Sequence, residues 1–339
     1  MASSVGPADT QREYDAIKSG AGICLLKERL IVRVSGDDRI SFMHGMCTAD
    51  VKSLAPGKLA RALFLTEHAH VIADCFIYAL QEQALWLEVE RPRWAAIREH
   101  LERFLVADDV ELEELDTLSV LDIEGPASID AVAGFAGNAV RELKQWQHLE
   151  RDGFCIANLP RYGEPAFTLI ASRTALAAVA ERMKQSCPGM CELNARTLET
   201  IRIENGLALI GIDTNERTLA LEARLEPAIA FDKGCYVGQE TIERATAHGS
   251  LKRRLYGVQI TGNEMPPPGT SIYLEGKEVG RLTSIASSPA SGTIGLAILH
   301  HSAWAAGTRV PIAGGNGMIT GLVCDLPFRQ MRPIATNEA

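Results

Sequence analysis

The chain has 339 residues, 46% of them hydrophobic and 23% charged, and a formal net charge of −9. This length is more than one hydrophobic core usually serves, so we expect two or three domains of an ordinary globular protein. The negative charge argues against a nucleic-acid partner. No apolar run approaches the ~20 residues needed to cross a bilayer, so no membrane partner is expected either.

The first third of the chain predicts four strands and two helices. The strands are expected at 30–34, 61–65, 70–79 and 85–89. Apolar residues at three-residue spacing predict a short amphipathic helix over 38–47. Arg91-Pro92 opens the second helix, because proline suits the first helical position. Residues 1–10 are small and polar, and we expect them to be frayed.

The middle of the chain mixes strand and helix signals. Strands are expected at 118–123, 154–158 and 166–170. One helix is predicted from Ser172 to about Gln185, and another over 195–205 stops at Gly206, a suitable C-cap. Because these elements do not alternate as a βαβαβ series, they favour an α+β fold over a doubly wound sheet.

The sequence changes character after about residue 251. Short strand candidates at 255–260, 271–274, 278–286, 293–299, 308–312 and 318–324 alternate with turns rich in glycine and proline. Strands at such regular spacing indicate a β-barrel or a β-sandwich.

Eight cysteines are scattered along the chain, and none forms a CxxC pair. Cys187 and Cys191 have no further cysteine or histidine at zinc-site spacing, so we expect no resident metal. No signal peptide is recognised at the N-terminus, which makes the reducing cytoplasm the expected location.

One segment carries most of the chemical information: Lys233-Gly234-Cys235-Tyr236-Val237-Gly238-Gln239-Glu240. Its two glycines permit a bent backbone, so we expect a loop rather than a strand or helix. Lys233 could favour the thiolate of Cys235, the form that attacks electrophiles and ligates metals. Alternatively, the cysteine is a small buried apolar residue. The loop precedes the β-rich region, and ligand clefts often form at such domain junctions.

This octapeptide resembles the K-G-C-Y-x-G-Q-E signature of the YgfZ-type folate-binding proteins, and all seven fixed positions match. These proteins are relatives of the glycine cleavage T-protein and serve iron–sulfur cluster assembly and repair. Other stretches resemble the same family in the same order: 34–38, 42–51, 202–206, 211–213 and 326–328. The resemblance covers most of the chain.

The resemblance implies three domains arranged as a ring, with folate in a central channel. The first two domains are α+β and the third is a β-barrel. Mapped linearly, the α+β folate-binding region occupies 1–115 and 116–250, the second part ending in the octapeptide, and the barrel occupies 251–339.

The resemblance also implies the folate ligands, with tetrahydrofolate or a derivative as the cofactor. The family's glutamate at the position of Glu204 binds the pterin ring, where a carboxylate can accept two parallel N–H bonds. Arg254 is expected to hold the anionic tail, helped by its basic neighbours Arg244, Lys252 and Arg253. Tyr236 and Gln239 complete the expected cofactor contacts.

Each of these assignments has a plainer alternative. Glu204 could be a solvated carboxylate at the end of a helix, and the arginines could form an ordinary basic rim. Tyr236 could be a packed aromatic residue.

Cys235 and Lys233 are the expected reactive residues. Cys235 could ligate iron, act as a redox thiol, or simply pack. One thiolate cannot supply the usual four-cysteine coordination of a cluster, so a transient ligand or a redox thiol fits better than a bound cluster. The leading hypothesis is a folate-binding accessory protein for iron–sulfur cluster assembly or repair. We expect a monomer whose partners are folate and iron–sulfur assembly or client proteins.

Two other functions stay open. A T-protein-type aminomethyltransferase needs an aspartate near the folate amine, after a strand that ends in Asn-Ala. The corresponding stretch, 86–92, contains neither feature, although Glu88 or Glu90 could substitute. This argues against a classical aminomethyltransferase, while any other turnover stays undecided. The third reading is a scaffold that has kept the fold without a ligand.

Overall fold

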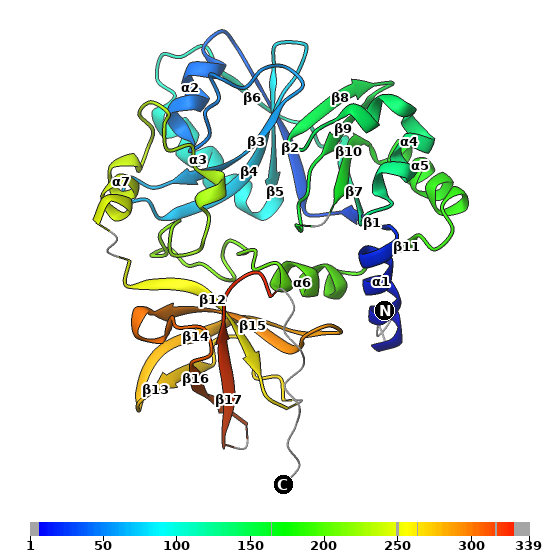
Figure 1. The fold of residues 1–339 in the computed structure, drawn as a ribbon. Coiled ribbons are helices and arrows are strands. Elements are labelled where there is room, and N and C mark those ends of the chain that lie inside the picture. The colour runs from blue at the N-terminus through cyan, green and yellow to red at the C-terminus, as the bar shows by residue number, and fades with distance from the viewer. Residues whose placement is uncertain (1–6, 164, 249–250, 263, 316, 329–339) are drawn as a thin grey trace. The chain divides into compact units, whose positions relative to one another are not determined.

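The structure is a computed structural model that describes residues 7–163, 165–248, 251–262, 264–315 and 317–328 (Figure 1). The chain divides into two compact units. The first comprises Met1–Glu67, Ile72–Asn194 and Pro227–Gln239, and the second comprises His68–Val71, Ala195–Glu226 and Glu240–Ala339. In sequence, the last segment of the first unit therefore lies between two segments of the second unit.

One sheet of the first unit has the strand order β3-β4-β5-β2-β6. Its strands are β2 (Arg29–Ser35), β3 (Leu59–Leu65), β4 (Val71–Ala79), β5 (Leu85–Glu90) and β6 (Glu111–Glu114). The four strands predicted in this region are confirmed. The edge strand β6 escaped prediction because its sequence, Glu-Leu-Glu-Glu, is mostly exposed and lacks apolar alternation.

Helices α2 (Arg39–Met46) and α3 (Trp94–Phe104) pack their apolar side chains against one face of this sheet. A 3₁₀ turn, η1 (Arg91–Arg93), precedes α3. The prediction of one helix from Arg91 was therefore wrong for its first three residues, which form the 3₁₀ turn. Pro92 does lie at the start of this turn, as proline at a helix start should.

The other sheet of the first unit has the order β11-β1-β7-β10-β9-β8. Its strands are β1 (Gly22–Leu26), β7 (Leu118–Glu124), β8 (Gln147–Arg151), β9 (Phe154–Asn158), β10 (Ala166–Ser172) and β11 (Cys191–Glu192). Helices α4 (Ser128–Ala136) and α5 (Arg173–Ser186) cover one face, as Figure 1 shows. The Ser172 hydroxyl caps α5 by accepting the Ala175 N–H at 3.3 Å. A 3₁₀ turn, η2 (Asn138–Glu142), follows α4.

The N-terminal segment differs from expectation. Helix α1 (Pro7–Ser19) begins inside the stretch that was expected to be frayed, and residues 1–6 lie outside the described residues. Side chains of α1 are held by the first unit: the Glu13 carboxylate accepts from the backbone N–H of Asn194 at 2.9 Å.

The two sheets of the first unit share a buried core. Ile31 and Phe76 from the first sheet belong to the same apolar cluster as Val120 and Ile170 from the second. With helices on the outer faces, the unit has four layers, and an apolar core lies between the two sheets.

A charged network is buried in the first unit. The Arg161 side chain is 4% exposed, and it contacts Asp122 of β7 at 2.6 Å and Glu88 of β5 at 2.8 Å. The Tyr78 hydroxyl donates to Glu88 at 2.8 Å, and the Thr168 hydroxyl donates to Asp122 at 2.6 Å. Because Glu88 and Asp122 belong to different sheets, one guanidinium joins the two.

Burial and pairing compete at these carboxylates. Burial alone would raise the pKa of Glu88, but the guanidiniums of Arg161 and Arg29 outweigh it and hold this pKa below its ordinary value. At Asp122 burial outweighs Arg161, and the pKa is raised. The two buried carboxylates therefore depend on the positive charge of Arg161.

Replacing Arg161 with methionine should destabilise the protein strongly. The change leaves Asp122 without its counter-charge and leaves Glu88 with Arg29, at 3.5 Å, as its cationic partner. We expect a loss of about 3–5 kcal/mol in the free energy of unfolding, measured by urea denaturation.

The matched control is Arg103→Met, because the Arg103 side chain is 69% exposed. Its effect should stay within about 0.5 kcal/mol. Equal losses in the two variants would contradict a special role for the buried network.

The second unit contains α6 (Ala195–Glu204) and a closed six-stranded barrel of order β12-β15-β14-β13-β16-β17. The barrel strands are β12 (Arg253–Ile260), β13 (Ser271–Leu274), β14 (Lys277–Ser288), β15 (Gly292–His300), β16 (Arg309–Gly314) and β17 (Gly317–Cys324). The short turns η3 (Glu226–Ala228) and η4 (His301–Ala303) are 3₁₀ helices, η3 belonging to both units. Apolar residues from several strands fill the barrel, among them Val258, Leu282 and Ile312. The predicted barrel is confirmed.

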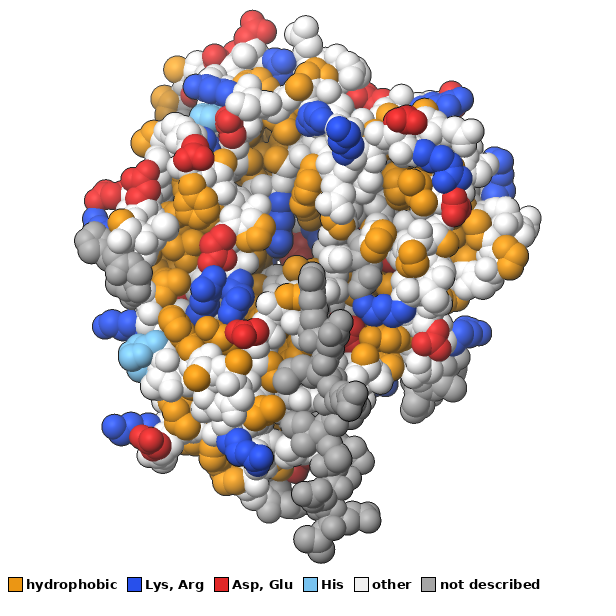
Figure 2. Space-filling model, viewed as in Figure 1, with side chains coloured by type: hydrophobic (Ala, Val, Ile, Leu, Met, Phe, Trp, Pro, Cys, Tyr) orange, Lys and Arg blue, Asp and Glu red, His pale blue; other side chains and the backbone are white. Residues whose placement is uncertain are grey.

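Acidic and basic side chains are interspersed on the face of the molecule drawn in Figure 2. Among the helices of the described residues, none is long and apolar enough to cross a membrane.

Candidate functional site

The octapeptide forms a loop over 233–238, as predicted, but its last two residues begin α7 (Gln239–His248). Gly238 has φ +88°, a conformation that favours glycine. Gly234 does not have a positive φ, and an added Cβ would meet the His44 Nε2 at an ordinary 3.6 Å. The expectation that both glycines shape the bend therefore holds for Gly238 only.

Lys233 anchors this loop. Its side-chain ammonium donates to the backbone carbonyl of His44, to that of Cys47 at 2.7 Å and to that of Ala49 at 2.8 Å. Burial lowers the pKa of Lys233. The ammonium also lies 4.9 Å from the centre of the Tyr236 ring. Lys233 thus ties the loop to the segment that follows α2, and activation of the Cys235 thiol by this residue stays a prediction.

Cys235 differs from the other cysteines in accessibility. All eight cysteines lie in the described part of the chain; four are buried, three are partly buried and Cys235 is exposed. Burial raises the pKa of Cys47 to about 11 and the pKa of Cys75 well above its ordinary value. Cys235 is therefore the thiol that a reagent in water reaches first, which excludes the reading of this residue as a buried apolar side chain.

A thiol-reactive chromogenic disulfide should label the folded protein in one fast step. We expect one equivalent to react rapidly in the native protein, because the other seven thiols are at least partly buried. Cys235→Ser should remove the fast step, measured by stopped-flow absorbance.

Cys187→Ser is the matched control, since Cys187 is partly buried and should leave the fast step intact. A fast step that survives in Cys235→Ser would mean that another cysteine is the accessible thiol.

Tyr236 and Gln239 form a hydrogen bond with each other at the end of the loop. The Tyr236 side chain is buried, and its backbone N–H donates to the Gln239 Oε1 at 3.3 Å. Tyr236 therefore packs within the first unit, and contact of either residue with folate stays a prediction.

Glu204, the last residue of α6, is buried in the second unit. Its carboxylate accepts a hydrogen bond from the Ser288 hydroxyl at the end of β14, and its backbone oxygen accepts from the Phe328 N–H at 2.7 Å. The alternative of a solvated helix-end carboxylate is wrong. Burial and a fixed orientation are what a carboxylate needs to align two parallel bonds to a ring.

Two further residues of this stretch form a buried ion pair. Arg202 contacts Asp213 at 2.6 Å, with side chains 6% and 0% exposed. Arg202 also donates to the Ser284 hydroxyl of β14 at 2.6 Å. The R-x-E-x-G…G-x-D pattern thus contains an arginine and an aspartate that hold α6 and the following turn onto the barrel.

Three of the four basic residues after the octapeptide, Arg244, Arg253 and Arg254, form ion pairs. Arg254 contacts Glu226 at 2.8 Å and Arg253 contacts Glu222 at 3.0 Å. Arg244 pairs with Glu240 one helical turn away. Even so, the Arg254 Nε is buried and has no hydrogen-bond partner among the described residues. That N–H is available for the anionic group of a ligand, so Arg254 keeps its expected role as a prediction.

The predicted residues divide between the two units. Lys233, Cys235, Tyr236 and Gln239 belong to the first, while Glu204 and Arg254 belong to the second. A common folate cavity formed by both groups is still a prediction. Among the described residues, no group of three or more histidine, cysteine or acidic side chains could hold a metal ion.

Comparison with known families accounts for nearly the whole chain. Residues 6–233 match the GCVT N-terminal domain, and residues 253–329 match the glycine cleavage T-protein C-terminal barrel domain. The chain belongs to the glycine cleavage T-protein family. Proteins of this family bind tetrahydrofolate as substrate or cofactor.

Individual relatives agree with this assignment. A chloroplastic protein of Arabidopsis thaliana, named as a transferase, is 28% identical over 96% of this chain and 76% of its own length. The aminomethyltransferase of Nostoc sp. is 27% identical over 83% of this chain and 77% of its own length. Cytoplasmic location of this chain stays a prediction.

The fold itself matches a solved structure. The glycine cleavage system aminomethyltransferase T of Bartonella henselae superposes with a TM-score of 0.87 at 21% identity, covering 97% of this chain and 92% of that one. The expected aminomethyltransferase-type fold, with mixed α/β domains and a C-terminal barrel, is confirmed.

Proposed function

We propose that this protein binds tetrahydrofolate, or a derivative, and serves iron–sulfur cluster assembly or repair as a YgfZ-type member of its family. The observation that carries the proposal is the exposure of Cys235, in a loop held by Lys233, while the other seven cysteines are buried or partly buried. An accessible thiol in the signature loop suits transient chemistry on a client better than a structural role.

Folate binding is supported by the state of two polar residues in the second unit. Glu204 is buried and oriented by Ser288, as a pterin ligand should be. Arg254 carries a buried N–H with no partner among the described residues, which an anionic tail would satisfy. Folate, when bound, would supply the one-carbon chemistry, and these residues would orient it.

The role of Cys235 is that of a transient ligand or a redox thiol. A single cysteine cannot retain a cluster that usually takes four. The anchored loop keeps the thiol presented to solvent, where an iron or cluster substrate can meet it.

The comparisons favour a second function, folate-dependent aminomethyl transfer, because relatives bear that name. Such chemistry needs a carboxylate near the folate amine. Glu88 is a poor candidate, since Arg161 and Arg29 hold it ionised within the buried network. Burial raises the pKa of the nearby Glu90, which makes Glu90 the better proton acceptor of the two.

Glu204→Gln should weaken tetrahydrofolate binding by about 10–100-fold, because the amide replaces one acceptor oxygen by a donor. Isothermal titration calorimetry under anaerobic conditions measures the change. The control is Glu275→Gln, an exposed glutamate of the barrel region that should leave affinity unchanged. Wild-type protein that binds no reduced folate would overturn the folate part of the proposal.

A paired experiment separates the two functions. In the first experiment the purified protein is assayed for methylene-tetrahydrofolate formation from an aminomethyl-loaded carrier protein, and we expect no turnover. In the second, Cys235→Ala is tested for restoring iron–sulfur enzyme activity in a strain that lacks the gene, and we expect no restoration. Turnover that Cys235→Ala leaves intact would establish the aminomethyltransferase instead, and full restoration by the variant would remove the thiol from the mechanism.

A further inference from the structure

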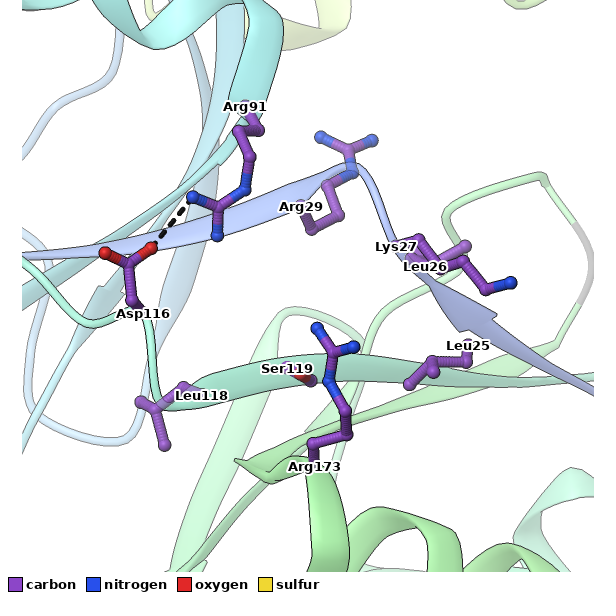
Figure 3. A pocket seen from close by; sticks show the side chains of 9 residues that line it. All are labelled: Leu25, Leu26, Lys27, Arg29, Arg91, Asp116, Leu118, Ser119 and Arg173. Carbon is purple, nitrogen blue, oxygen red and sulfur yellow. Dashed lines mark hydrogen bonds and ion pairs between the residues drawn. The ribbon is translucent and has the colours of Figure 1, made fainter.

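A pocket of about 260 Å³ opens in the first unit, apart from every residue predicted from the signature (Figure 3). Its wall is formed where β1 passes into β2, at η1, along the start of β7 and at the first residue of α5. Drug-sized ligands occupy roughly 300–1,000 Å³, so the pocket is too small for a whole folate.

The charged side chains that line this pocket are mostly positive. Four of its lining side chains are cationic, Lys27, Arg29, Arg91 and Arg173, against the single carboxylate of Asp116. Asp116 is already engaged by Arg91 at 2.8 Å, as the dashed line in Figure 3 marks. Among the described residues no carboxylate pairs with Lys27 or Arg173.

Arg29 lines the pocket and carries an unsatisfied donor. Its side chain is 15% exposed, its Nε lies 3.5 Å from Glu88, and its Nη1 is buried with no hydrogen-bond partner in the described part of the chain. A buried N–H left unpaired is costly, so the Arg29 side chain gains from any additional acceptor near it.

The three arginines that line the pocket come from separate elements. Arg29 is the first residue of β2, Arg91 begins η1 and Arg173 begins α5. In Figure 3 Arg173 extends from the start of α5 past β7 toward the strand that carries Arg29. Guanidiniums prefer planar or tetrahedral oxyanions, because their N–H groups match these oxygens in pairs.

We propose that this pocket binds a small oxyanion with two or more negative charges, of the phosphate-ester or oligocarboxylate type. Arg173 and Lys27 supply unpaired charge, and Arg29, Arg91 and Ser119 also line the pocket. The site is independent of the folate proposal, since no residue assigned to folate lines it.

The direct test titrates the full-length protein with inorganic pyrophosphate and, separately, with tri-γ-glutamate at low ionic strength. Calorimetry should give a sub-millimolar Kd for at least one probe, weakening as salt is added. The tighter probe identifies the ligand type. No saturable binding of either probe at millimolar concentrations would overturn the proposal.

Arg173→Gln should reduce the affinity for the bound probe at least about tenfold, the loss expected for one charge-assisted contact. Arg173 is exposed and holds no ion pair in the described residues, so thermal unfolding should be unchanged. Lys27→Gln provides a second variant with the same expectation.

The matched control is Arg309→Gln, which removes one exposed arginine from the barrel and should leave binding intact. Equal weakening by Arg173→Gln and Arg309→Gln would mean that the probe responds to overall charge alone, and the site would be rejected. Tetrahydrofolate binding measured in parallel should not respond to Arg173→Gln, which keeps a failure here distinct from a failure of the folate proposal.

Discussion

The contacts of Arg161 with Glu88 and Asp122 hold the two sheets of the first unit to each other. Taking three charges out of water is costly, and the cost is offset only while the guanidinium stays within hydrogen-bond distance of both carboxylates. This requirement fixes the distance between β5 and β7. Arg29, which lines the basic pocket, contacts the same Glu88 carboxylate at 3.5 Å.

A second anchoring interaction pairs a charged group with uncharged backbone carbonyls. Lys233 places an ammonium among three backbone carbonyls, so the signature loop is fastened to the segment after α2 without any acidic partner. Cys235 can be exposed because its neighbour carries the attachment. In the signature, therefore, the lysine anchors the loop and the cysteine is the residue that reaches solvent.

Apolar patterning predicted the long strands and the barrel because burial on one face leaves a period in the sequence. It missed β6, β8 and the two-residue β11, where exposure or shortness removes that period, and it also missed β1. The contacts of the candidate site residues could not be predicted in this way. Burial of Glu204 depends on Ser288, 84 residues away, and pairing of Arg254 depends on Glu226, so no local pattern carries this information. A charged residue within an apolar strand, such as Glu88, was the available signal for the buried network.

The first unit is assembled from three stretches of chain, and the last of them supplies the Lys233 ammonium. On the ribosome, the carbonyls of residues 44, 47 and 49 emerge nearly two hundred residues before their donor. The nascent chain can pair its strands early, yet it cannot close the signature loop until the first two segments of the second unit, His68–Val71 and Ala195–Glu226, have also been made. The exposed thiol of Cys235 therefore reaches its final position only after the strands and helices of residues 7–194 have been synthesised.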